Sequence, residues 1–192
     1  MAQIRSFVAI ELSESIKESL SAIAGKLQPS KHRCVKWVAP DGIHLTLKFL
    51  GNIYADQVPG ITEAIASASR DISPFEIQLG APGAFPNLRQ PRVIWVAVTG
   101  EVKQLKELQQ DVDIALSHFG FEREKRPFTP HLTLGRIREG ASSGDRERIG
   151  KEVSALKFRS GPPMEVNGIS LMRSTLMASG AVYDRLATIE LR

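Results

Sequence analysis

Apolar and polar residues in the first part of the chain follow the period of a strand and then that of a helix. Residues 6–12 form a short apolar run that is typical of a buried strand. Ser13 is a suitable N-cap for a helix directly after it. The apolar positions of that helix recur at helical spacing and are Ile16, Leu20, Ile23 and Leu27.

The pattern continues with a turn, a strand, a second helix and a third strand. Residues 40–42, Pro-Asp-Gly, predict a turn just before a strand that contains HLTL at 44–47. Apolar spacing predicts a helix over residues 56–69. A strand beginning at residue 75 leads into a Pro- and Gly-rich segment, residues 81–92, which is predicted to be a basic loop that could rim a site.

The same succession of patterns starts again in the second half. It predicts a strand at 92–98, a helix that ends near Gly120, a second HLTL strand at 131–134, a further helix within 140–156, and neighbouring strands at 164–175 and 181–191. In each half the middle of the first strand precedes the HLTL histidine by 36 positions. We therefore expect a duplicated strand–helix unit, with repeats of about 4–85 and 92–192 in one bilobal domain over 1–192 whose strands can cross between lobes.

Composition adds modest constraints. The chain has 192 residues, a hydrophobic fraction of 42% and a charged fraction of 24%, as in ordinary globular proteins. The net charge of +4 slightly favours an anionic ligand. Cys34 is the single cysteine, which excludes an internal disulfide and suits a reducing compartment. With no signal-peptide pattern and no long apolar run, we expect a cytoplasmic protein with no membrane association.

The two HLTL segments carry the candidate chemistry. Because side chains alternate along a strand, His44 and Thr46 share one face, and so do His131 and Thr133, while the leucines face a core. Two opposed imidazoles near their ordinary pKa of about 6.5 could serve as base and acid, with two hydroxyls for the oxygens of a phosphate. This set needs no metal, and the chain lacks HxH and HxxxH patterns.

A single His-x-Thr on a strand is usually structural, with the ring bonded to a backbone carbonyl. Two copies in equivalent contexts favour a functional interpretation, because packing alone does not call for histidine twice. The remaining histidines, His32 and His118, lack such a context and are predicted to lie on the surface.

The chain resembles the 2H phosphoesterase superfamily, and within it the bacterial RNA 2′,3′-cyclic phosphodiesterases, historically called 2′-5′ RNA ligases. The resemblance covers nearly the whole chain. It is carried by RSFVAIEL, WVAPDGIHLTLKFLG, RVIWVAV, RPFTPHLTLGR and LMRSTLMASGAVYDRL. We find no departure within the two histidine motifs.

The resemblance implies an α+β fold with two antiparallel sheets, related by a pseudo-twofold axis around a central cleft, and helices on the outer faces. It implies hydrolysis of an RNA terminal 2′,3′-cyclic phosphate to a 2′-phosphate without a cofactor. By position, His131 would be the proton acceptor and His44 the proton donor, with Thr46 and Thr133 binding phosphate. From the residues alone the two histidines are interchangeable.

Further residues are weaker candidates for RNA contacts. Phe49 could stack on a base or fill the core, and the core is favoured. Arg136 could face phosphate only if a bend or bulge interrupts the alternation after His131. Phe128 could stack on the terminal nucleotide, and Tyr183 matches a family position that could simply pack. Contacts to upstream phosphates, or only a solvated basic rim, are expected from Arg89, Arg92, Arg123, Lys125 and Arg126.

Three alternatives stay open from the sequence. The same residues could join RNA halves through a 2′-5′ linkage if a 5′-hydroxyl replaced water. The fold could bind RNA ends without turnover, or it could act on small cyclic nucleotides. Nothing in the sequence indicates an obligate oligomer, so we expect a monomer.

Overall fold

The computed structural model of the chain describes residues 3–27, 33–177 and 180–192, which form strands, α-helices and two short 3-10 helices. The strands are β1 (Gln3–Ile10), β2 (Val35–Trp37), β3 (Leu45–Tyr54), β4 (Phe75–Phe85), β5 (Val93–Gly100), β6 (His131–Ile137), β7 (Met164–Val166), β8 (Gly168–Met177) and β9 (Gly180–Glu190). The helices are α1 (Glu14–Leu27), α2 (Val58–Ala68), α3 (Val102–Ser117) and α4 (Ser143–Ala155), with 3-10 turns at Pro40–Gly42 and Ala55–Gln57.

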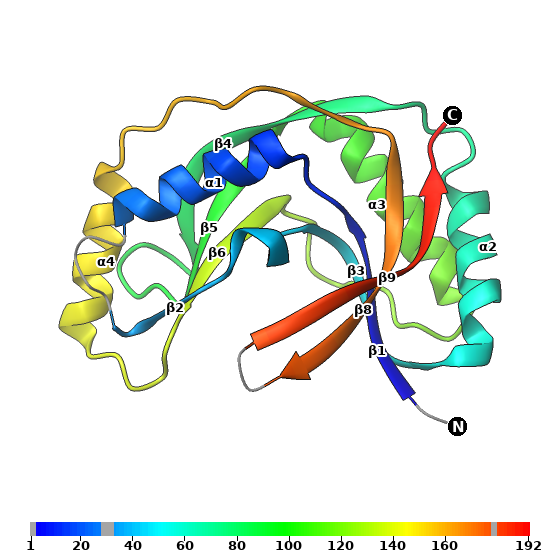
Figure 1. Cartoon of the computed structure of the whole chain (residues 1–192), viewed down its shortest axis with the longest axis horizontal. Coiled ribbons are helices and arrows are strands. Elements are labelled where there is room, and N and C mark those ends of the chain that lie inside the picture. The colour runs from blue at the N-terminus through cyan, green and yellow to red at the C-terminus, as the bar shows by residue number, and fades with distance from the viewer. Residues whose placement is uncertain (1–2, 28–32, 178–179) are drawn as a thin grey trace.

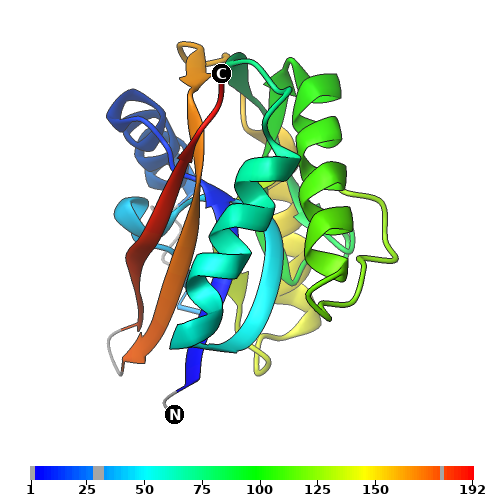
Figure 2. The same ribbon diagram turned by 90° about the vertical axis from the view of Figure 1, so that its right-hand side faces the viewer.

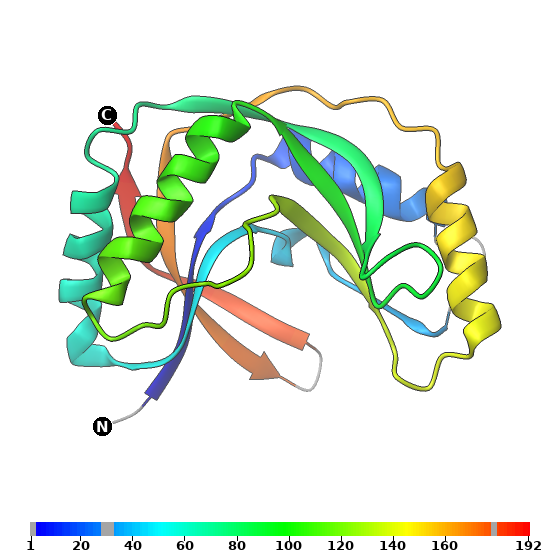
Figure 3. The same cartoon turned by 180° about the vertical axis from the view of Figure 1, so that it is seen from behind.

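The strands form two antiparallel sheets that together shape an arch (Figure 1). One sheet has the order β3-β1-β8-β9, and the other has the order β2-β6-β5-β4-β7. Helices α2 and α3 pack side by side on the outside of the four-stranded sheet (Figure 2). Helices α1 and α4 lie on the outside of the five-stranded sheet, as the reverse view also shows (Figure 3). The fold is therefore the predicted α+β arrangement of two antiparallel sheets with outer helices.

Both sheets combine strands from the two halves of the chain. The C-terminal strands β8 and β9 join β1 and β3, while β2 and β4 join β5, β6 and β7. Helix α1 follows β1 in sequence but lies over the other sheet (Figure 1). The chain crosses the arch several times, so neither half builds a sheet by itself.

The helical stripes predicted from the sequence form the core. All four apolar positions of α1 are buried, as are Ile61 and Ile65 of α2. The buried apolar stripe of α3 consists of Leu105, Leu108, Val112 and Leu116. They join the buried strand residues in one hydrophobic cluster. Each fully buried Leu or Ile contributes about 1.5–3 kcal/mol, so this cluster is the main source of stability.

Several predicted elements differ from the structure in their bounds, among them the first strand, which is β1 at Gln3–Ile10 and not 6–12. Residues 81–85, predicted as loop, belong to β4, because the strand absorbs Pro82 at a bulge between Leu79 and Pro82 and then continues its pairing with β5. The strand predicted over 164–175 is two strands in different sheets, and β8 pairs with β9 as expected. The second helix starts with a 3-10 turn. Among the described residues, no helix is long and apolar enough to cross a membrane.

Candidate active site

Aromatic residues of two strands in the same sheet, β1 and β9, fix the ring of His44, which lies just before β3. The ring stacks on Phe7 of β1 at 4.5 Å between centroids, with 24° between the planes. Tyr183 of β9 meets it edge-on at 4.8 Å. A hydrogen bond to the backbone of Gly42 adds a third restraint. The half-buried imidazole is thereby held in one orientation.

His131, the first residue of β6, is held in a similar way. Its Nδ1–H donates to the carbonyl oxygen of Thr129 at 2.7 Å, so in the neutral ring the Nε2 lone pair is free. Phe85 of β4 meets the ring edge-on at 4.9 Å, and Trp95 of β5 lies 6.2 Å away. Trp95 itself covers Gly83, where a Cβ would lie 2.6 Å from the indole. In both motifs the ring therefore bonds to the backbone two residues earlier and packs against aromatic side chains.

The predicted alternation holds inside each HLTL. Thr46 and Thr133 are half-buried, while the leucines Leu45, Leu47, Leu132 and Leu134 are at most 4% exposed. We call the face of each sheet that carries the motif histidine and threonine its inner face. The motif leucines share one buried cluster with residues of the helices, so the inner faces lie on the side away from the helices, which cover the outside of the arch (Figure 3).

A β-bulge interrupts the alternation directly after Thr46. Ala9 of β1 faces Thr46, and its neighbour Val8 faces Lys48, so Leu47 has no partner of its own. Leu47 and Lys48 are both buried on the helix side. The residues beyond this bulge consequently change faces.

Because of this bulge, Phe49 lies on the inner face. It faces Phe7 across the strand pair, with ring centroids 6.1 Å apart, and its side chain is 68% exposed. Our preference for a core position is wrong. Phe49 instead extends the aromatic row that begins with Tyr183, His44 and Phe7 on the inner face.

An equivalent bulge follows the second motif. Neighbouring residues Ile94 and Trp95 of β5 face Gly135 and Thr133, so Leu134 is passed over in the pairing. Gly135 occupies this position because a Cβ there would lie 2.9 Å from the side chain of Val35 on β2. The bulge that Arg136 requires in order to share a face with His131 is thus present.

Arg136 lies on the inner face, exposed and directly opposite Val93 of β5. It is five positions after His131, just as Phe49 is five positions after His44. The two sheets therefore place an arginine and a phenylalanine at equivalent points beside their motifs.

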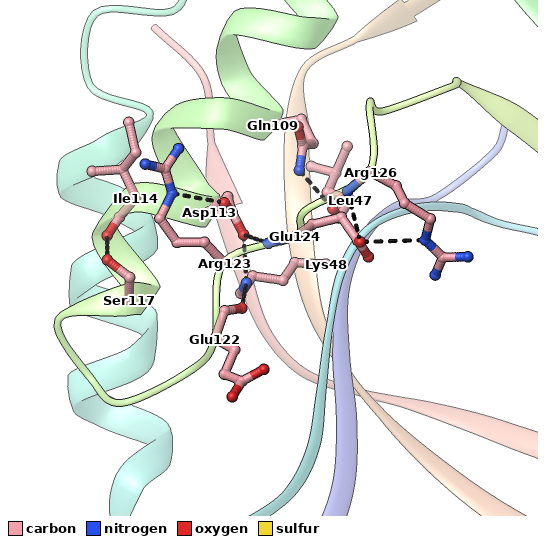
Figure 4. A network of polar contacts seen from close by, with 10 residues as sticks. All are labelled: Leu47, Lys48, Gln109, Asp113, Ile114, Ser117, Glu122, Arg123, Glu124 and Arg126. Atoms are coloured by element: carbon pink, nitrogen blue, oxygen red, sulfur yellow. Dashed lines mark hydrogen bonds and ion pairs between the residues drawn. The ribbon is translucent and has the colours of Figure 1, made fainter.

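The first bulge also directs the side chain of Lys48 away from the inner face and into a buried polar network (Figure 4). This network was not predicted from the sequence. Its ammonium donates to the Asp113 carboxylate of α3 at 2.5 Å and to the carbonyl of Glu122 at 2.8 Å. Asp113 also accepts from the Arg123 side chain and from the backbone N–H of Glu124, each at 3.2 Å. The network ties β3 to α3 and to the segment that leads to the second motif.

Burial acts to raise the pKa of Asp113, but the hydrogen bonds from Lys48, Glu124 and Arg123 outweigh it and hold that pKa below its ordinary value. Strict alternation placed Lys48 beside Thr46 on the inner face. The one sequence signal that could have found the pair is an aspartate, Asp113, next to Val112 in the apolar stripe of α3.

The basic segment before the second motif is partly engaged within the protein. Arg123 pairs with buried Asp113, and Arg126 lies 3.5 Å from Glu124. Phe128 is half-buried and packs against the main core. Of these residues, Arg123 and Arg126 have the most exposed side chains and offer the most surface to a ligand.

The other predicted surface residues are exposed. Arg89 and Arg92 lie in the β4–β5 connection, and Lys125 lies in the connection before β6. His118 caps α3 and is exposed as predicted. The surface position predicted for His32 lies outside the described residues.

Burial lowers the pKa of His44 to about 4, although the Gly42 hydrogen bond and the charge of Glu11 act to raise it. Glu11 lies on the same inner face, and its own pKa is lowered chiefly by a hydrogen bond from Arg185. That guanidinium binds both carboxylate oxygens at 2.7 Å. In the free protein His44 is therefore neutral at pH 7.

Two antiparallel sheets that each present one His-x-Thr on the inner face, with helices on the outer faces, define the two-histidine phosphoesterase class. The chain belongs to the 2′-5′ RNA ligase superfamily, whose family model matches residues 7–176.

Two named relatives match over their full length. The chain is 31% identical over 189 residues to an RNA 2′,3′-cyclic phosphodiesterase of Methanothermobacter thermautotrophicus, covering 98% of this chain and 100% of the relative. It is 34% identical to the protein of that name from Archaeoglobus fulgidus, covering 97% and 100%. The crystal structure of TT0787 of Thermus thermophilus matches with a TM-score of 0.78 at 28% identity over 98% of both chains.

Proposed function

We propose that this protein hydrolyses the 2′,3′-cyclic phosphate at RNA 3′ ends to a 2′-phosphate. The proposal rests on the paired geometry of the two motifs. Each sheet presents a histidine with a fixed ring and a threonine on its inner face, and a bulge follows each motif. The full-length similarity to proteins named RNA 2′,3′-cyclic phosphodiesterase supports the choice of substrate.

In the proposed reaction His131 is the base. Its Nδ1–H bond to Thr129 leaves Nε2 free to take a proton from water, whose oxygen attacks phosphorus. The bond from phosphorus to the 3′-oxygen breaks, and His44 gives its proton to that oxygen. The hydroxyls of Thr46 and Thr133 donate to the non-bridging oxygens, where negative charge is held throughout.

The low pKa of His44 fits an acid that is loaded by its substrate. A phosphate anion next to the ring favours the imidazolium and raises its pKa from about 4 toward neutrality. The ring would then carry a proton only in the complex, where the leaving oxygen needs it.

The first test is product analysis with an oligonucleotide that ends in a 2′,3′-cyclic phosphate, in excess EDTA. We expect opening to a 2′-phosphate, and a loss of about 10²–10⁴-fold in His44→Ala and in His131→Ala. No opening by the wild-type protein, or a 3′-phosphate product, would contradict the proposal.

Leaving-group replacement separates the acid from the base. A phosphodiester that expels p-nitrophenolate needs no proton on its leaving oxygen. On that substrate His44→Ala should recover most of its activity, whereas His131→Ala should stay defective. The reverse pattern would exchange the two roles.

Ligation through a 2′-5′ linkage uses the same acid and base, with an RNA 5′-hydroxyl in place of water. Hydrolysis is the proposed function because water is always present at the site. Incubation with two RNA halves, one with a cyclic phosphate and one with a 5′-hydroxyl, would reveal a joined product if ligation competed.

A further inference from the structure

The inner face of the five-stranded sheet carries a second cation beside Arg136. Lys36 of β2 lies directly opposite Arg136 of β6, in a register that continues with Trp37 opposite Gly135. Directly opposed residues of an antiparallel pair share a face. Lys36 therefore lies on the same inner face as His131 and Thr133.

These two cations face each other without an anionic partner. Both side chains are exposed, and within the described part of the chain neither forms an ion pair. Like charges directly opposite each other on neighbouring strands destabilise a sheet. The pair thus has an unfavourable local energy that an anion bound between the two side chains would reverse.

The position of the pair separates it from the reacting phosphate. Arg136 follows Thr133 by three residues, so the pair lies roughly 10 Å along β6 from the threonine, at about 3.3 Å per residue. A phosphate held at Thr133 leaves the opposed cations free for another anionic group. In an RNA end, the next such group is a backbone phosphodiester.

We propose that Lys36 and Arg136 form a second phosphate subsite, which binds the phosphodiester upstream of the cyclic end. This inference rests on the proposed function and deepens it. The subsite makes the protein prefer an RNA end over a mononucleotide, because a single cyclic nucleotide has no second phosphate.

A competing explanation concerns the edge of the sheet. β2 is the outermost strand on its side, and lysines on edge strands discourage pairing with other chains. An edge lysine of that kind has no need of an arginine directly opposite it. The two explanations predict different behaviour when the charge of Lys36 is removed.

The experiment compares Lys36→Gln with wild type on two substrates, a nucleoside 2′,3′-cyclic phosphate and a dinucleotide with one internal phosphodiester and the same cyclic end. We expect kcat/KM to fall about three- to fivefold on the dinucleotide and to stay within about twofold on the mononucleotide. For oligonucleotides, the slope of log kcat/KM against log salt should decrease by about 0.7, as for one lost contact to a single strand.

Stability supplies an independent measurement. Because the opposed charges repel, the Tm of Lys36→Gln should equal or exceed that of wild type, which a merely structural lysine would not produce. Lys103→Gln is the matched control: it removes one charge from a 92% exposed side chain on α3, on the other sheet's outer side. It should change neither the substrate preference nor the salt slope.

Two results would overturn the inference. Equal losses on both substrates would place Lys36 at the reacting phosphate, and aggregation without any kinetic change would identify an edge-protecting lysine. If the wild-type protein opens neither substrate, the proposed function fails separately. Fluorescence anisotropy with a 3′-phosphorylated oligonucleotide then decides the subsite, which requires weaker binding by Lys36→Gln than by Lys103→Gln.

Discussion

The buried Lys48–Asp113 pair allows a quantitative prediction of how much it contributes to the free energy of unfolding. Lys48→Met removes the ammonium and leaves Asp113, which is 4% exposed, with only Arg123 and the Glu124 amide as donors. Removing one partner of a buried ion pair costs about 3–5 kcal/mol, because the other charge stays buried. That is a large share of a typical unfolding free energy of about 5–15 kcal/mol.

Urea unfolding, followed by circular dichroism, measures the change. We expect the midpoint to fall without a change in slope, and the Tm to fall by roughly 6–20 °C for a domain of this size. Lys103→Met is the control, since its side chain is 92% exposed, and it should change the free energy by less than about 0.5 kcal/mol.

The double variant Lys48→Met with Asp113→Leu tests whether the buried, unpaired carboxylate causes the loss of stability. Replacing both members of a buried pair by apolar residues is often neutral or stabilising. We therefore expect most of the lost stability to return. A cost below about 1 kcal/mol for Lys48→Met, or a double variant less stable than Lys48→Met, would refute this account of the network.

Further predictions concern the two motifs. Because the pKa of His44 is lowered to about 4, the unfolded chain binds a proton there that the folded chain does not between pH 6.5 and 4. The wild type should therefore lose up to about 3 kcal/mol more than His44→Gln on acidification from pH 7 to pH 4, as urea titrations at each pH would show. Phe49→Ala should change the free energy of unfolding by less than about 0.5 kcal/mol, because the residue is 68% exposed. The loss of about 1–3 kcal/mol of stacking should raise KM for RNA ends about 5- to 150-fold; an unchanged KM would exclude stacking. Gly83→Ala places a methyl group 2.6 Å from the Trp95 ring next to His131, so it should cost about 1–3 kcal/mol and reduce kcat; a wild-type kcat would show that the indole does not position His131.

Periodicity and chemistry along the chain sufficed for much of the fold and for the identity of the motif residues. The helical stripes of α1 and α3 and the alternation inside each HLTL depend on neighbours within a few residues, and the structure buries the expected leucines. The duplicated unit, the acid and base roles, the monomeric state and the cytoplasmic location stay predictions.

Only the tertiary structure decided which residues surround the motifs. Alternation assigns faces correctly while each residue has one partner across the strand pair, and a bulge arises from pairing with a distant strand. The bulges at Leu47 and Leu134 bring Phe49 and Arg136 to the inner faces and bury Lys48 against Asp113. The mixing of both halves in each sheet, which sets Phe7 and Tyr183 around His44, likewise depends on contacts between residues far apart in the chain.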